Sequence, residues 1–187
     1  QWSDDGSVLA GEVVLWLLFV LLYFPVDGHI SPAITAGAWA CGQCTLGAAA
    51  LNVAMQMIGS ALAIESVKAL VDPQLRQHYH APTPFYLEMG VWPAVQFELK
   101  CTFAIVLLCL GCDVFGSLDR RYILVTTVAV ALCHWTQAQM DPVGAFCGAL
   151  WEKKFAHLEV YWLGSLAGGW LAGVVWRAHE AYRDKRW

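Results

Sequence analysis

The sequence predicts an all-α integral membrane protein, and two features of its composition and pattern indicate this fold class. Of its 187 residues, 58% are hydrophobic and only 14% are charged, whereas a soluble domain carries about a quarter charged residues. The apolar residues gather in long runs, and about 20 of them are enough to cross a bilayer. We therefore expect the lipid bilayer to surround most of the chain.

Five apolar runs are long enough to span the membrane. They cover residues 8–24, 45–70, 97–116, 122–139 and 158–177. The segment 72–95 is polar and rich in Pro, His and Tyr, a composition that indicates an exposed connection.

Two further apolar runs, 31–41 and 141–151, are too short to cross a bilayer. Ser31-Pro32-Ala33 opens the first and Asp141-Pro142-Val143 opens the second. A polar cap followed by proline is typical of a helix start. Helix ends inside a membrane persist only where they pack in protein or line a cavity. We therefore expect two re-entrant half-helices whose positive ends meet within the membrane, as in a channel.

The distribution of basic residues supports re-entrant segments. Arg120 and Arg121 lie between the third and fourth spans, and more basic residues follow the last span within 177–186. Cytoplasmic loops carry an excess of Lys and Arg. Both groups fall on one side of the membrane only if the short segments re-enter without crossing.

Other classes of function find little support. A net charge of −4 without a basic block argues against a nucleic-acid partner. The pairs Cys41/Cys44 and Cys109/Cys112 have zinc or redox spacing, but their neighbours are small and apolar, which favours packing as small hydrophobic residues. The sequence shows no nucleophile–base pair and no phosphate-binding loop. We expect no enzyme activity, no cofactor and no metal.

The short runs resemble the pore motifs of the aquaporin (major intrinsic protein) family, in the form of a divergent member. Residues 27–37, D-G-H-I-S-P-A-I-T-A-G, are similar to the family's G-A-H-L-N-P-A-V-T-L-G. Residues 136–146, T-Q-A-Q-M-D-P-V-G-A-F, are similar to T-G-A-S-M-N-P-A-R-S-F. Three weaker matches follow in family order: Q-M-I-G at 56–59, E-L-K-C-T-F at 98–103 and V-Y-W-L-G at 160–164.

The resemblance implies an inverted-repeat bundle around a site at the membrane midplane. Counting back from Ser31, the run 8–24 takes the place of the family's second helix, so we expect the first family helix to have no counterpart in this chain. The expected organisation is one membrane domain over 1–187. Its parts are a partial first repeat (8–71), a connection (72–95), a second repeat (96–177) and a polar C-terminal tail (178–187).

At the pore centre, the resemblance places Ser31 and Asp141 where the family has two asparagines. Ser31 retains a hydroxyl donor, but an ionised Asp141 can only accept hydrogen bonds. A buried carboxylate in a membrane is costly unless it is paired or protonated. Two readings of Asp141 stay open: a cap that faces protein, or a pore-lining carboxylate that admits cations or weakens proton exclusion.

At the outer selectivity filter, Gly144 takes the position of the family's arginine. Ala129 takes the position of the filter histidine, if the alignment has no gap. Losing both side chains removes a cationic barrier and widens the constriction. Glu98 resembles the family's buried glutamate, which organises hydrogen bonds around half-helix backbone; a structural role is expected here.

Two functions are therefore compatible with the sequence. One is a channel for water or small neutral solutes with a degenerate pore, assembled as a homotetramer as in the family. The other is a non-conducting, aquaporin-derived structural subunit that packs against other membrane subunits. The altered triplets favour the second function, whereas the retained prolines and caps fit either. Of the two functions, we expect the channel.

Overall fold

The computed structural model describes residues 29–70, 88, 90–111, 127–129, 131–132, 135–136 and 138–185. Over these residues five helices have described bounds: α2 (Pro32–Cys41), α3 (Leu46–Leu70), α5 (Val91–Gly111), α7 (Pro142–Glu152) and α8 (Leu158–Asp184). The described part of the chain contains no strand, which confirms the all-α class. The expected span 8–24 and residues 120 and 121 lie outside the described residues. Of the expected span 122–139, residues 127–129, 131–132 and 135–136 are helical.

Three of the helices, α3, α5 and α8, are long and apolar enough to cross a membrane. They correspond to the expected spans 45–70, 97–116 and 158–177. The short helices α2 and α7 correspond to the expected half-helices 31–41 and 141–151. Each expected element within the described residues is therefore present, with differences at its ends.

The start of α5 differs most from the expectation. The helix begins at Val91, so residues 91–95, which the sequence assigned to the polar connection, are helical. Gly90 adopts a left-handed φ of 99° just before the helix, a conformation that glycine accepts readily. Pro93 lies in the first turn, where a missing N–H leaves no intrahelical hydrogen bond unmade. Proline therefore marks the beginning of this helix and not the end of a loop.

The C-terminal part of α8 also differs. The helix continues to Asp184 and so includes most of the segment 178–187 that was expected as a polar tail. No glycine or proline follows Gly173, and alanine, glutamate and arginine, all good helix formers, occupy several of the later positions. The helix therefore extends beyond its apolar stretch.

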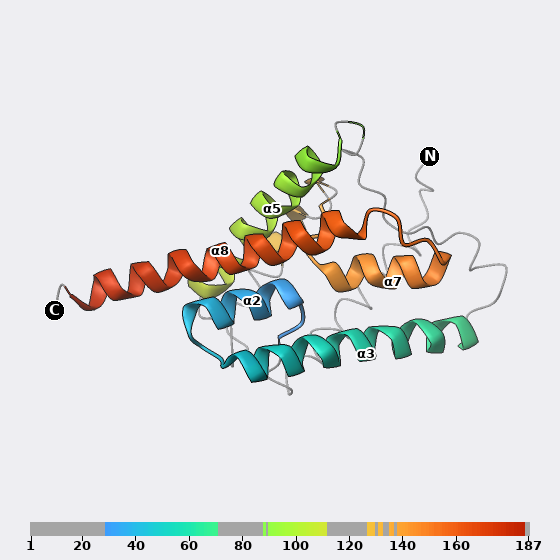
Figure 1. Cartoon of the computed structure of the whole chain (residues 1–187), viewed down its shortest axis with the longest axis horizontal. Helices are drawn as coiled ribbons and strands as arrows, with labels where there is room; N and C mark the ends of the chain where they lie inside the picture. Colours follow the sequence, from blue (N-terminus) through green and yellow to red (C-terminus); the bar gives the residue numbers. More distant parts are fainter. Residues whose placement is uncertain are drawn as a thin grey trace.

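The two half-helices lie between two long helices. Figure 1 shows α8 and α3 running along the long axis of the molecule, with α2 and α7 between them, and both short helices contact both long ones. The starts of α2 and α7 point toward each other near the middle of this layer. α5 crosses α8 and forms with it the most extensive helix contact among the described elements.

Glycines on α8 allow this close packing. A Cβ at Gly164 would lie 2.9 Å from a carbonyl oxygen of α5, and one at Gly168 would lie 2.5 Å from the carbonyl oxygen of Leu99 in α5. A Cβ at Gly169 would collide with the carbonyl oxygen of Ala33 in α2. One face of α8 thus receives α5 and the adjacent face receives the half-helix α2. Small residues in membrane helices serve such close backbone approach.

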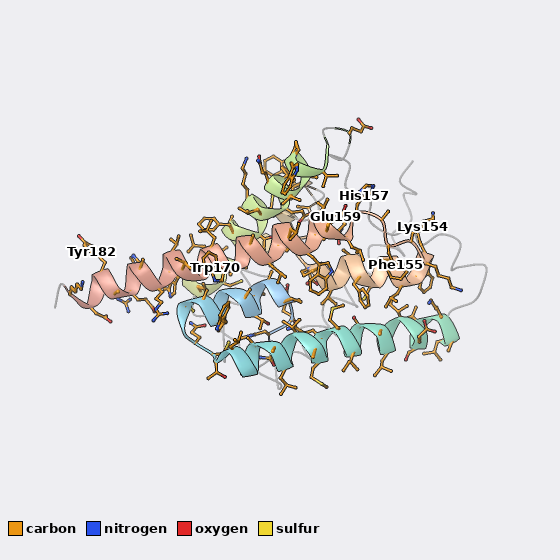
Figure 2. The ribbon with its side chains drawn as sticks, viewed as in Figure 1. Lys154, Phe155, His157, Glu159, Trp170 and Tyr182 are labelled. Carbon is orange, nitrogen blue, oxygen red and sulfur yellow. The ribbon has the colours of Figure 1, made fainter. Side chains whose placement is uncertain are left out.

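Large apolar side chains cover the outer faces of the bundle. On α3 they are Leu46, Leu51, Met55, Ile58, Leu62, Val67 and Leu70. Figure 2 shows Trp170 on α8, Tyr182 near the far end of that helix, and Lys154, Phe155 and His157 in the short connection from α7 to α8. Such an apolar exterior with polar residues at the ends of helices suits a protein surrounded by lipid.

Candidate functional site

The caps of the two half-helices meet in one hydrogen bond. The Ser31 hydroxyl donates to Oδ1 of Asp141 at 2.8 Å, although the two residues are 110 positions apart. Ser31 Oγ also accepts a hydrogen bond from the N–H of Ala33 (3.2 Å) in the first turn of α2. The Asp141 carboxylate accepts from the N–H groups of Val143 and Gly144, each at 3.2 Å. Each side chain therefore caps its own helix while the two contact each other.

This arrangement gathers positive potential around the carboxylate. A helix N-terminus carries roughly half a positive charge, and a nearby anion is stabilised by it. Because two helix N-termini converge on Asp141, its charge is compensated from two sides as well as by three hydrogen-bond donors. Asp141 is part-buried and Ser31 is only 7% exposed.

The remaining residues of the two triplets pack against the protein interior next to the caps. Pro32 and Pro142 occupy the first helical positions and are fully buried. Ala33 is also fully buried, against Gly169, whereas Val143 is part-buried. The prolines and Ala33 are thus held by packing, and the polar atoms of Ser31 and Asp141 form the junction.

A buried carboxylate on α5 holds the backbone that leads into α7. Glu98 is fully buried, and its two carboxylate oxygens accept hydrogen bonds from the N–H groups of Gln139 and Met140, both at 2.9 Å. Met140 has a left-handed φ of 52°, so this segment is not helical and its N–H groups need side-chain acceptors. These contacts fit the structural role that the family resemblance implied for Glu98, which stays a prediction.

A polar side chain on α3 holds the loop that leads into α2. The Gln56 amide nitrogen donates to the carbonyl oxygen of His29 and to the hydroxyl of Thr35 (3.3 Å). Thr35 Oγ1 in turn donates to the carbonyl oxygen of Ser31 (3.1 Å) and lies 3.2 Å from Nδ1 of His29. His29 and Gln139 each lie two residues before a cap. Each repeat therefore uses one polar side chain from a long helix to hold the same place in its loop.

A lysine at the end of α3 contacts the other end of α7. Lys68 Nζ donates to the carbonyl oxygen of Leu150 at 3.2 Å and pairs with Glu65 at 2.7 Å. The last carbonyls of a helix carry partial negative charge, which a cation stabilises. Glu65 and Lys68 are visible in the sequence as interruptions of an apolar span, but their contact with the second half-helix was not predicted.

The two expected filter positions, Gly144 and Ala129, lie in different surroundings. Gly144 lies in the first turn of α7, where the nearest side-chain atoms to an added Cβ would be Oε1 of Gln139 (3.4 Å) and Oδ2 of Asp141 (3.8 Å). Ala129 is part-buried and packs against the hydrophobic cluster that includes Met140. Sequence reasoning missed Gln139, Gln56 and Thr35; the available signal was a polar residue inside an apolar run.

Cys41 and Cys44 have no contact with this junction among the described residues, and Cys112 of the second pair lies outside them. Cys41 Sγ donates to the carbonyl oxygen of Ala38 at 3.3 Å, and burial raises the pKa of the Cys44 thiol in the connection between α2 and α3. A protonated thiol is a poor metal ligand. Among the described residues, no three His, Cys, Asp or Glu side chains are grouped to hold a metal ion.

Comparison with known proteins gives a consistent result. The model of the family described as "Major intrinsic protein" matches residues 7–176. A probable aquaporin TIP4-2 of Oryza sativa subsp. japonica is 35% identical over 162 residues, which cover 80% of this chain and 60% of the relative. Aquaporin TIP1-1 of Zea mays is 31% identical over 187 residues, covering 93% of this chain and 72% of the relative. A probable aquaporin TIP4-1 of Oryza sativa subsp. japonica is 28% identical, with 96% and 75% covered.

The chain thus spans about three-fifths to three-quarters of the length of these relatives. The family match includes both half-helices, all of α3 and α5, and α8 as far as residue 176, and it confirms the resemblance that the pore motifs indicated. The chain is therefore an integral membrane protein that belongs to the major intrinsic protein family.

Proposed function

We propose that this protein is a membrane channel for water or small neutral solutes, and that Ser31 and Asp141 form the centre of its pore. The observation that carries the proposal is the 2.8 Å hydrogen bond between the two caps. It brings the starts of two half-helices together between α3 and α8, as a pore built from half-helices requires. The relatives named above are described as aquaporins, which supports the same conclusion.

The hydrogen-bonding chemistry of this centre differs from that of two asparagine side chains, which can both donate. The Ser31 hydroxyl is engaged as a donor to Asp141, so it offers a passing molecule only its remaining acceptor capacity. The Asp141 carboxylate, when ionised, also only accepts hydrogen bonds. A water molecule at the centre would therefore turn its hydrogens toward Asp141.

A carboxylate at this position also changes the charge of the pore. The positive ends of α2 and α7 would repel protons and other cations on their own. Asp141 opposes that potential with a titratable negative group. We propose that the channel excludes protons less strictly than a pore whose centre carries two amides.

The test is the osmotic response of liposomes that contain the purified full-length protein. Stopped-flow light scattering would measure water efflux, and uptake of urea and glycerol would be measured in parallel. We expect faster exchange than in protein-free liposomes and in liposomes with an unrelated, non-conducting membrane protein at the same mass ratio. Native mass spectrometry of the same sample would test assembly as a homotetramer.

The alternative is a non-conducting structural subunit, and the same experiment distinguishes it. If water and both solutes exchange at the rates of the protein-free liposomes, the channel proposal is wrong. The junction of Ser31 and Asp141 would then only stabilise the fold, and the next step would be to identify other membrane subunits that co-purify with the protein.

A further inference from the structure

The side-chain oxygen of Gln139 borders the space beside Gly144. An ideal Cβ on Gly144 would lie 3.4 Å from Oε1 of Gln139 and 3.8 Å from Oδ2 of Asp141. These are ordinary van der Waals distances, so the glutamine amide and the carboxylate together cover the bare backbone of residue 144. The place where a longer side chain at 144 would begin is bordered by the side chain of residue 139.

The backbone of Gln139 is fixed from the opposite side. Its N–H donates to Oε1 of the fully buried Glu98 at 2.9 Å, and the next N–H along the chain, of Met140, donates to Oε2 of the same carboxylate. The position from which the Gln139 side chain projects is therefore set by α5. A side chain on a fixed backbone makes a better-defined constriction than one on a mobile loop.

Gln139 is also part-buried, in contrast to the fully buried Glu98. Its amide adds an acceptor oxygen next to the Asp141 carboxylate, and it carries no charge. The selectivity of a pore depends on its diameter and on the hydrogen-bonding groups that line it. Residue 139 thus combines a fixed backbone with a long, neutral and partly exposed side chain.

We propose that Gln139 is the specificity-determining residue of this channel. It narrows the pore beside Gly144 with an uncharged amide, so that solutes are selected by size, without a cationic barrier. This inference rests on the proposed channel function, because a constriction has meaning only in a conducting pore. Small neutral solutes are the class that such a constriction would pass.

The test compares glycerol and water permeability in liposomes that contain parent protein, Gln139→Asn, Gln139→Ser or Gln96→Ser. The serine variant withdraws the side chain from residue 144, and the asparagine variant withdraws it less. Gln96 is exposed on α5, so its variant is a matched control. We expect Gln139→Ser to raise the ratio of glycerol to water permeability by roughly tenfold, the order that small changes of size make in a selective site. Gln139→Asn should raise it less, and Gln96→Ser should not change it.

A second variant tests the space itself. Gln139→Ser combined with Gly144→Arg would place a long cationic side chain where the glutamine amide had been. We expect the double variant to return the glycerol-to-water ratio to the parent value or below it. Size-exclusion profiles and thermal unfolding in detergent would show that each variant is folded.

The outcomes separate the two proposals. If the parent conducts water and both Gln139 variants keep the parent ratio, the channel proposal stands and the role of Gln139 is wrong. If the parent exchanges water and solutes no faster than protein-free liposomes, both proposals are wrong. A change of ratio in Gln96→Ser equal to that in Gln139→Ser would also contradict a specific role for Gln139.

Discussion

Gly173 of α8 lies directly against the carbonyl oxygen of Gly37 in α2, and a Cβ at position 173 would overlap that oxygen. The half-helix and the long helix thus touch through their backbones. This contact and the neighbouring contact of Gly169 with Ala33 set how α2 lies on α8, and therefore where Ser31 is held.

We predict that Gly173→Ala destabilises the protein by about 1–3 kcal/mol, because overpacking of a tight contact forces backbone shifts. Thermal unfolding in detergent would measure the change. Gly59→Ala is the matched control, since nothing lies within 4 Å of an added Cβ at that position of α3. There alanine should stabilise the helix by about 0.5–1 kcal/mol. Equal effects at the two positions would contradict the close packing of α2 on α8.

Glu98 accepts two backbone hydrogen bonds, one at each carboxylate oxygen. In Glu98→Gln one of these oxygens becomes an NH₂ group, which would face a backbone N–H. We expect a loss of about 1–3 kcal/mol, the cost of a buried donor without an acceptor. Glu159→Gln, on a half-exposed side chain of α8, should leave the unfolding temperature unchanged. A Glu98→Gln protein as stable as its parent would show that these hydrogen bonds do not hold the loop before α7.

The hydroxyl of Thr35 joins Ser31, His29 and Gln56 in one network, whereas the fully buried Ser165 hydroxyl has no hydrogen-bond partner among the described residues. Removing each hydroxyl, by Thr35→Val or Ser165→Ala, should therefore have different consequences. Thr35→Val should cost about 1–3 kcal/mol, because it leaves buried groups unpaired. Ser165→Ala should leave stability unchanged or raise it. The prediction fails if Ser165→Ala lowers the unfolding temperature as much as Thr35→Val does.

Lys68 connects α3 with the C-terminal end of α7 through the carbonyl oxygen of Leu150. Lys68→Met keeps the apolar stem and removes the charge, and we expect a loss of about 1 kcal/mol from the helix-dipole contact. Lys154→Met is the control, because Lys154 is 77% exposed and its ion pair with Glu152 contributes little. Chemical unfolding monitored by tryptophan fluorescence would compare the two variants. A larger effect at Lys154 would contradict the assigned contact.

The sequence predicted the half-helices well because neighbouring residues in the chain specify where each one starts. A polar cap and a proline specify where α2 and α7 begin, and both begin as expected. The apolar runs likewise predicted the three described long helices. The start of α5 was misplaced because a proline such as Pro93 can lie in a loop or in the first turn of a helix. The left-handed conformation of Gly90, which distinguishes these two cases, is visible only in the structure.

The contacts of the site were less predictable. Family resemblance indicated that Glu98 organises backbone, but no local pattern shows that Gln56 supports the matching place in the first repeat. These contacts join α3 or α5 to loops 27 and 41 positions away in the chain. Gln139 was also missed, because the role proposed for it depends on the bare backbone at Gly144 beside it.

The central claim is that a carboxylate stands where the two half-helices meet in the pore. Proton influx into dye-loaded proteoliposomes, driven by a potassium diffusion potential, tests it with parent protein and Asp141→Asn. Asparagine is also a good cap, and its one amide oxygen can accept the Ser31 and Val143 hydrogen bonds. The contact between the caps is thus retained, while the titratable charge and the acceptor for the Gly144 N–H are lost. We predict markedly slower proton influx in Asp141→Asn with water permeability preserved. Equal proton influx in the two proteins would contradict a carboxylate at the centre of the conducting path.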